Sequence, residues 1–150
     1  MLLLGIEKPA VKIRELEAGD GAAIAALLEQ LGYPATREQI RRRLERLALS
    51  TSDVKWVAEL DGTLMGLVGI HVSASLEHDA DVAKVTEIVV DERFRRQGVG
   101  GALLATAERE AARRGCELIY LTTAERRKDA HEFYRRLGYE ETGRRFAKPL

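Results

Sequence analysis

The segment from Val82 to Leu104 constrains the fold of this chain more than any other part of the sequence. Residues 82–90 are rich in β-branched side chains, which favours a β-strand. A short basic loop follows, and beyond it the apolar residues recur at helical spacing. Three glycines stand where this predicted helix begins: Gly98, Gly100 and Gly101. The first N–H groups of a helix lack intrahelical partners and carry partial positive charge, and glycine admits another molecule close to them. The segment therefore predicts a phosphate-binding strand–loop–helix unit.

Two common phosphate-binding motifs do not fit these glycines. A P-loop needs a lysine and a hydroxyl residue directly after its last glycine, but Gly101 and Ala102 follow Gly100. The dinucleotide-binding fingerprint needs a third glycine where Leu103 stands, and it normally opens a βαβ unit. The glycines therefore indicate a different kind of phosphate site.

Composition excludes several classes of function. Lysine plus arginine and aspartate plus glutamate both number 24, so no net charge draws the chain to nucleic acid or to a membrane. The single cysteine, Cys116, excludes an internal disulfide, and the three histidines lack the spacing of metal ligands. No apolar run approaches the ~18 residues of a membrane span. We therefore expect one cytoplasmic domain over residues 1–150, with no nucleic-acid, membrane or metal partner.

The order of predicted elements is β-α-α-β-β-β-α-β-α-β(β), an α/β chain of the α+β type with a mixed sheet. The helices are marked by apolar stripes, by the Thr36–Gln39 capping box and by glycines at their ends. Asp61-Gly62 predicts a hairpin turn. The predicted strands cover residues 11–16, 55–60, 63–70, 82–90 and 117–123, with two short closing strands within 139–148. The predicted helices cover residues 20–31, 36–47, 99–111 and 129–137.

Two motifs in this order carry a family resemblance. Arg95-x-x-Gly98-x-Gly100 is similar to the acetyl-CoA signature of the GCN5-related N-acetyltransferases, the GNAT superfamily. The stretch from Ala130 to Tyr139 resembles the family's tyrosine-bearing helix, and the element order matches the family over essentially all 150 residues. One position departs from the family: Arg127 stands where many members carry an asparagine that contacts CoA.

The resemblance implies acetyl-CoA as cosubstrate and a sheet that splays between the fourth and fifth strands. The pantetheine arm would pair with backbone in this gap, and the pyrophosphate would lie at the helix start. Glycine at positions 98 and 100 would then avoid a clash between a Cβ atom and the pyrophosphate. The implied acetyl-CoA-binding residues are Ile88, Val89, Val90, Arg95, Arg96, Gln97, Gly98, Val99, Gly100, Gly101 and His131.

Acetyl transfer to an amine needs a base for the ammonium proton, polarisation of the carbonyl oxygen and a proton for the departing thiolate. By family position, Glu87 is the candidate base or amine-orienting group, although it could also be an outward-facing strand residue. Tyr134 is the candidate acid, although an aromatic on that helix face is ordinarily a core residue. The oxyanion donor would be a main-chain N–H at a strand bulge near Ile88 or Val89.

We expect an N-acetyltransferase that works by direct attack of a primary amine in a ternary complex. The amine site would include Glu87 and Tyr33 of the Gly32-Tyr33-Pro34 junction. An acidic loop with Glu77, Asp79 and Asp81 favours a small cationic acceptor. The sequence leaves the acceptor open, as well as the choice between monomer and homodimer. The alternatives are a non-catalytic acyl-CoA-binding module, a protein N-terminal acetyltransferase and a nucleotide-binding interaction domain.

Overall fold

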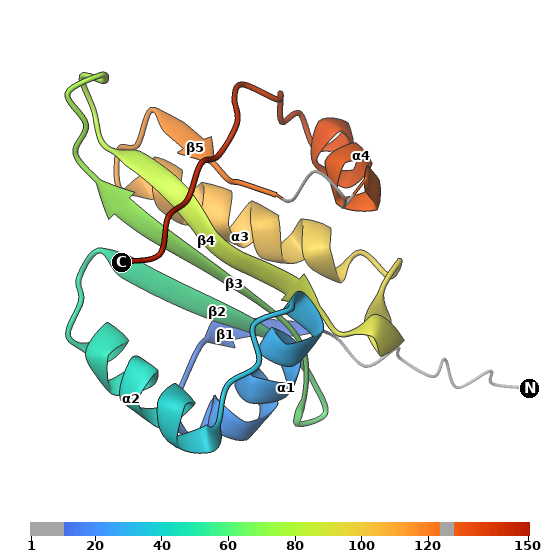
Figure 1. Cartoon of the computed structure of the whole chain (residues 1–150). Helices are drawn as coiled ribbons and strands as arrows, with labels where there is room; N and C mark the ends of the chain where they lie inside the picture. Colours follow the sequence, from blue (N-terminus) through green and yellow to red (C-terminus); the bar gives the residue numbers. More distant parts are fainter. Residues whose placement is uncertain (1–10, 124–127) are drawn as a thin grey trace, which may run out of the picture.

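The computed structural model describes residues 11–123 and 128–150 and contains a five-stranded sheet with helices on both faces (Figure 1). The strands are ordered β1-β2-β3-β4-β5 across the sheet, antiparallel except for the parallel pair β4–β5. The elements are β1 (Lys12–Glu15), η1 (Ala18–Asp20), α1 (Gly21–Leu31), α2 (Arg37–Ala48), β2 (Asp53–Leu60), β3 (Thr63–Ser73), β4 (Val82–Val90), η2 (Glu92–Phe94), α3 (Val99–Arg113), β5 (Leu118–Tyr120) and α4 (Lys128–Arg136), where η denotes a 3₁₀ helix.

Local sequence signals account for several element boundaries. Thr36 caps α2 by accepting a hydrogen bond from the Gln39 N–H, and the Gln39 side chain accepts one from Thr36, as the capping box predicts. Gly32 ends α1 in the left-handed conformation, with φ +99°. Asp61 and Gly62 both have positive φ, which joins β2 to β3 through the predicted tight hairpin.

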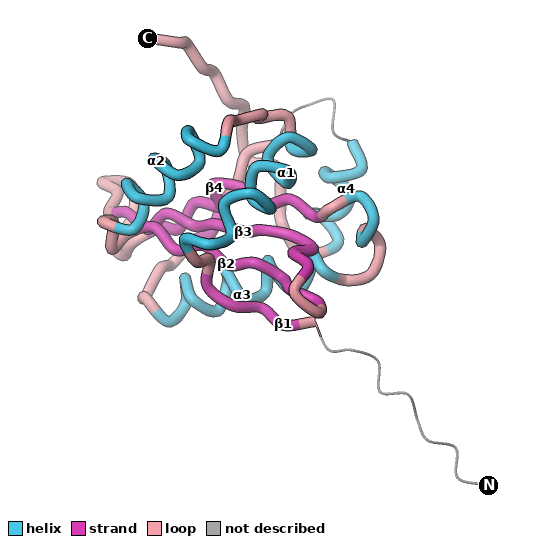
Figure 2. Tube along the Cα trace, turned by 90° about the horizontal axis from the view of Figure 1, so that it is seen from below, coloured by secondary structure: helices cyan, strands magenta, loops and turns pink. Residues whose placement is uncertain are grey.

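The sheet lies between α3 on one face and α1 and α2 on the other (Figure 2), and an apolar cluster fills each side. On one face, α3 packs Leu103, Leu104 and Ala107 against the sheet. On the other face, α1 and α2 cover a second cluster that contains Val57 of β2, Leu67 of β3 and Val89 of β4. Because side chains alternate along a strand, Lys55, Gly69 and Glu87, each two positions from one of these three, lie on the α1–α2 face.

The predicted closing strands within residues 139–148 are wrong. No strand forms among the described residues from 137 onward, and every side chain from Glu140 to Leu150 is exposed. Figure 2 shows this C-terminal segment projecting from the body of the molecule. The segment is dominated by charged residues, with Phe146 and Leu150 as its large apolar side chains. It therefore has little apolar surface whose burial could offset the entropy of ordering it.

The fifth strand is shorter than predicted. β5 covers Leu118–Tyr120, and it pairs only with Val82, Ala83 and Lys84 of β4. Among the described residues, the edge of β4 beyond Lys84 has no ladder partner on the β5 side. No helix in the described part of the chain has the length and apolar character needed to cross a membrane.

Candidate active site

The glycine segment forms the start of α3, and residues 91–97, which include η2, connect it to the end of β4. Gly98 is the residue before the helix and has φ +82°, a left-handed conformation that favours glycine. No side chain caps the helix at this position, and its first turn contains no acidic residue. The first N–H groups of α3 and the positive end of its dipole are therefore suited to an anion.

The other two glycines differ in their surroundings. A Cβ atom on Gly100 would lie 3.2 Å from Phe133 Cζ and 3.5 Å from Val90 Cγ2, so this glycine lets α4 pack against the start of α3. A Cβ atom on Gly101 would meet nothing within 4 Å. A Cβ atom on Gly98 would also meet nothing within 4 Å, but its positive φ favours glycine. Gly98 and Gly100 thus have structural reasons to be glycine apart from any pyrophosphate, whereas Gly101 has neither a positive φ nor a close neighbour.

The arginines beside the glycines have different partners. Arg93 is bound to Asp91 through its backbone N–H at 2.9 Å and through its guanidinium at 2.9 and 3.1 Å. The hydrogen bond from the Arg93 side chain lowers the pKa of the buried Asp91 to about 2. Arg95 donates to the carbonyl of Val90 at 3.2 Å, and Arg96 is exposed with φ +62°. Since Arg93 is committed to Asp91, Arg95 and Arg96 are the arginines that would face an anion here.

Glu87 forms an ion pair that sequence analysis missed. On the sheet, Gly69 of β3 lies between Glu87 of β4 and Lys55 of β2, opposite both. Lys55 Nζ lies 2.5 Å from Glu87 Oε1 and donates a hydrogen bond to Thr86 Oγ1 at 2.7 Å. Glu87 Oε1 is buried, and the ammonium of Lys55 is the charged partner that compensates it. The signal for this pair was a lysine within the otherwise apolar run 54–58, but the sequence does not give the cross-strand register.

The irregularity in β4 lies at Thr86. Gly69 pairs with Glu87 and Ile70 pairs with Val85, so Thr86 is the extra residue of a bulge. The predicted bulge near Ile88 or Val89 is therefore wrong, because both residues pair regularly with β3. The bulge at Thr86 allows one ammonium, that of Lys55, to contact two consecutive residues of β4.

More charged groups surround this pair on the α1–α2 face of the sheet. Asp53 lies two residues before Lys55 and contacts His71 Nδ1 at 3.1 Å, and the Ser50 hydroxyl donates to it at 2.7 Å. Burial opposes ionisation of Asp53, but the hydrogen bonds from Ser50 and His71 outweigh it and lower the pKa of Asp53. Lys84 pairs opposite His71 on the next strand. This part of the sheet face therefore presents both signs of charge.

Tyr134 lies on α4 and is 9% exposed, within the cluster under α3. Its ring makes edge contacts with Phe133 and Tyr139, at centroid distances of 5.3 and 6.0 Å. Tyr139 in turn donates a hydrogen bond to Glu108 of α3 at 3.1 Å, and burial, followed by this carboxylate, raises the pKa of the Tyr139 hydroxyl. The Tyr134 ring is thus a core residue, and an acid role for its hydroxyl stays a prediction.

The remaining predicted site residues are more scattered. His131 lies on α4 and is half-buried, whereas Gln97 and the acidic loop residues Glu77, Asp79 and Asp81 are exposed. Arg127 lies outside the described residues. The described residues contain no group of three or more side chains that could hold a metal ion.

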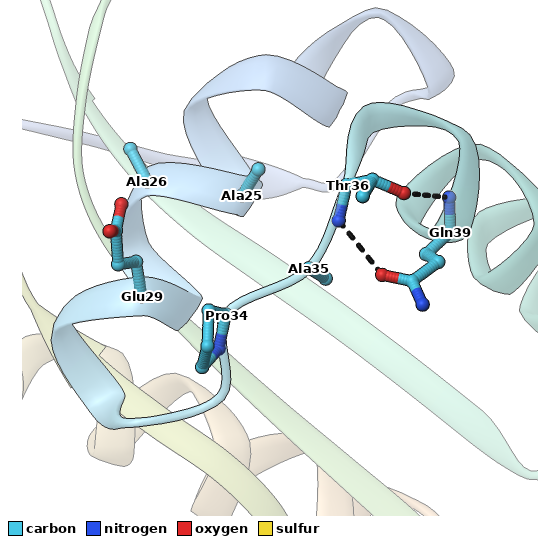
Figure 3. A pocket seen from close by; sticks show the side chains of 7 residues that line it. All are labelled: Ala25, Ala26, Glu29, Pro34, Ala35, Thr36 and Gln39. Atoms are coloured by element: carbon cyan, nitrogen blue, oxygen red, sulfur yellow. Dashed lines mark hydrogen bonds between the residues drawn. The ribbon is translucent and has the colours of Figure 1, made fainter.

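Tyr33 is in the loop between α1 and α2 and is 61% exposed. The small pocket at this junction has a volume of about 430 Å³ and is lined by Pro34, Ala35 and the capping residues Thr36 and Gln39, with α1 on its other side (Figure 3). Tyr33 does not line it. A larger groove of about 690 Å³ runs between η1, α2 and the start of β2, and Lys55 lies in its wall. Sequence analysis predicted the amine site at the α1–α2 junction, whereas the groove that contains Lys55 lies beside α2.

Comparison with known proteins assigns the family. The sequence profile of the Acetyltransferase (GNAT) family matches residues 22–139. The aminoalkylphosphonate N-acetyltransferase of Salmonella typhimurium is 33% identical over 147 residues, which cover 95% of this chain and 93% of that protein.

Solved structures have the same fold. A transcriptional regulator from Bacillus halodurans C-125 has a TM-score of 0.87 at 23% identity, over 94% of this chain and 100% of that chain. The aminoglycoside N-acetyltransferase AAC(6')-Iy in complex with CoA has a TM-score of 0.85 at 21% identity, over 98% and 99% of the two chains. The fold is therefore that of the GNAT acetyltransferases. The chain belongs to the GNAT family and is an acetyl-CoA-dependent N-acetyltransferase.

Proposed function

We propose that this protein transfers the acetyl group of acetyl-CoA to a small primary amine by direct attack in a ternary complex. The observation that carries the proposal is the course of β4, which bears Glu87 and ends at Val90, in contact with the uncapped start of α3 at Gly100. One strand thus connects a carboxylate suited to an ammonium with a helix terminus suited to a pyrophosphate.

In the proposed step, the amine nitrogen attacks the thioester carbonyl carbon, so that a C–N bond forms and the C–S bond breaks. Glu87 first accepts one proton from the ammonium, directly or through water, so that the nitrogen gains the lone pair that attacks. As the tetrahedral intermediate collapses, Tyr134 gives its proton to the departing thiolate, and the second proton lost by the nitrogen returns through solvent to the tyrosine. A main-chain N–H of β4 near Ile88 or Val89 stabilises the oxyanion.

The acetyl-CoA site is proposed to follow the end of β4 and the start of α3. The pantetheine arm would pair with the backbone of Ile88, Val89 and Val90, where β4 has no ladder partner on the β5 side among the described residues. A splay between β4 and β5 would provide this gap. The pyrophosphate would lie against residues 95–101, with His131 of α4 lining the acyl end.

The acceptor is proposed to be a small molecule whose amino group is cationic and which also carries an oxyanion. The relative from Salmonella typhimurium is named for aminoalkylphosphonates, which have this pair of groups. The charges around Glu87 agree with such an acceptor, because Lys55, Lys84 and His71 stand beside Asp53 and Glu87 on one face of the sheet.

The test is an amine panel with the purified protein and acetyl-CoA, read by release of free thiol and by the mass of the product. We expect aminoethylphosphonate to be acetylated faster than ethylamine, an aminoglycoside or a peptide with a free N-terminus. CoA binding without thiol release for any amine would instead favour a non-catalytic acyl-CoA-binding module. Faster acetylation of the peptide would favour a protein N-terminal acetyltransferase.

A further inference from the structure

We propose that Lys55 is the residue that selects an acceptor bearing an oxyanion. In the free protein, its ammonium occupies the place at Glu87 that the amino group of the acceptor takes. When the acceptor binds, Lys55 exchanges Glu87 for the oxyanion of the acceptor. This inference rests on the proposed function, because it assumes that an acceptor amine binds at Glu87.

The first support is the way the sheet is built around this pair. Lys55 and Glu87 are on strands that do not pair with each other, and Gly69 of β3 lies between them. A Cβ atom on Gly69 would overlap Glu87 Oε1 and would lie 2.5 Å from Lys55 Cδ and 2.6 Å from Lys55 Nζ. Gly69 does not have a positive φ, so no backbone conformation requires glycine there. The absence of a side chain at Gly69 therefore permits Lys55 and Glu87 to contact each other across β3.

The second support is the balance of charges. The Lys55 and Glu87 side chains are 12% and 22% exposed, so each is poorly solvated and needs its partner. An amine with no oxyanion would pair with Glu87 but would leave Lys55 with the Thr86 hydroxyl alone. An acceptor with both groups replaces one ion pair by two, because its ammonium faces Glu87 and its oxyanion faces Lys55. Lys55 therefore penalises a plain amine and favours a zwitterionic one.

The third support is the space beside Lys55. The groove of about 690 Å³ has Lys55 in its wall, and its lining carries both signs of charge: Arg37 and Arg41 of α2 lie beside the carboxylates of Glu15, Glu38, Glu45 and Asp53. Arg41 is paired with Glu38 and Glu45, whereas no ion pair of Arg37 is found among the described residues. An oxyanion that pairs with Lys55 in this groove thus has the guanidinium of Arg37 in the same lining as a second positive group. A short aminoalkyl chain that ends in a phosphonate, a phosphate or a carboxylate has the required chemistry.

The experiment compares kcat/KM for aminoethylphosphonate and for ethylamine in the wild type and in Lys55→Gln. We expect the preference for aminoethylphosphonate to fall by about tenfold to a hundredfold in the variant, mainly through KM, because one charge-assisted contact is lost. Ethylamine should be acetylated at least as efficiently as by the wild type. Lys55→Arg should keep most of the preference, and Lys12→Gln on the edge strand β1 is the matched control that should keep all of it.

Gly69→Ala provides a second variant that keeps both charges. The added methyl group displaces the flexible ends of Lys55 and Glu87 and leaves the backbone free to pair as before. It should reduce the preference while the melting temperature remains near that of the wild type, and it decides the matter if Lys55→Gln fails to fold.

Three results are distinguishable. An unchanged ratio of the two kcat/KM values in Lys55→Gln and in Gly69→Ala would overturn the role of Lys55. An equal loss for both acceptors would also overturn it, since Lys55 would then only support Glu87. A wild-type protein that acetylates neither acceptor nor any other amine would overturn the proposed function itself.

Discussion

The surroundings of Glu87 suit the role of base that we propose for it. Its carboxylate lies on a strand whose neighbouring side chains are largely apolar, and the ammonium of Lys55 compensates its charge. A carboxylate held in this way is available to receive a proton from a bound ammonium, which has no lone pair until that proton leaves.

Replacing Glu87 by Gln should therefore lower turnover by about a hundredfold at neutral pH. The deficit should shrink as the pH rises, because free amine then exists without a base. The measurement is kcat as a function of pH for the wild type and the variant, with Glu140→Gln in the exposed C-terminal segment as control. A deficit of equal size at every pH would indicate that Glu87 only positions the amine.

Replacing Tyr134 by Phe separates the role of the ring from that of the hydroxyl. The ring contacts with Phe133 and Tyr139 should persist, so melting temperature and acetyl-CoA affinity should change little. Turnover should fall by about a hundredfold, the low end for general-acid help, because a thiolate is already a fair leaving group. Full activity combined with a lower melting temperature would mean that the hydroxyl serves the core and not the reaction.

At the scale of elements, the turn from β4 into α3 determines how the helix start is presented. Asp91 fixes this turn by accepting hydrogen bonds from the backbone and the guanidinium of Arg93. Gln30 of α1 adds a link from the other face of the sheet, because its side-chain oxygen accepts a hydrogen bond from the Glu92 N–H at 2.9 Å.

The pKa of Asp91 predicts how this turn responds to acid. Because the folded value of about 2 lies below the usual 3.8, the ionised carboxylate stabilises the folded state. That contribution is complete above the unfolded pKa and is lost as the pH falls through the folded value. Asp91→Asn should therefore cost about 1–2 kcal/mol at neutral pH, allowing for the solvent exposure of Arg93, and close to nothing near pH 2. Urea unfolding at a series of pH values measures this, and a cost independent of pH would contradict it.

A substitution at the start of α3 can separate an effect on folding stability from an effect on acetyl-CoA binding. Ala at position 101 places its Cβ in open space and replaces a glycine in a helix, so stability should hold or rise by up to about 1 kcal/mol. If the pyrophosphate lies there, acetyl-CoA affinity should fall in the same variant, as calorimetry would measure. Unchanged affinity would remove Gly101 from the cofactor site. Gly100 is a poorer probe, because its substitution would also disturb the packing of Phe133.

Sequence analysis predicted those elements whose determinants are local. The α2 capping box, the Asp61-Gly62 hairpin and the glycine-started α3 all formed as expected, because each depends on residues a few positions apart. The extent of β5 and the fate of residues 139–148 depend on pairing partners distant in sequence, and these predictions failed. Glu87 was predicted from its family position, and its role stays a prediction. Lys55 was missed because its contact requires the register of three strands and the bulge at Thr86.

At the scale of the whole molecule, the two faces of the sheet differ in the side chains they carry and in the proposed site that each supports. The face under α3 is a continuous apolar cluster that holds the helix whose start is the proposed phosphate site. The face under α1 and α2 is apolar at Val57, Leu67 and Val89 but charged where Lys55 and Glu87 stand. β4 borders both regions, so the proposed acceptor and cofactor sites are held by one strand.

The C-terminal segment bears on the size of the functional unit, which we expect to be a monomer or a homodimer. In the single chain, all side chains from Glu140 to Leu150 are exposed, and Phe146 is 93% exposed. A chain that works alone should therefore tolerate removal of residues 142–150, with a change in free energy of unfolding within about 0.5 kcal/mol, because no buried contact is lost. Thermal melting and sedimentation of the full and the shortened protein, each at several concentrations, measure this. A loss of several degrees that depends on protein concentration would contradict the monomer and place this segment against a second copy of the chain.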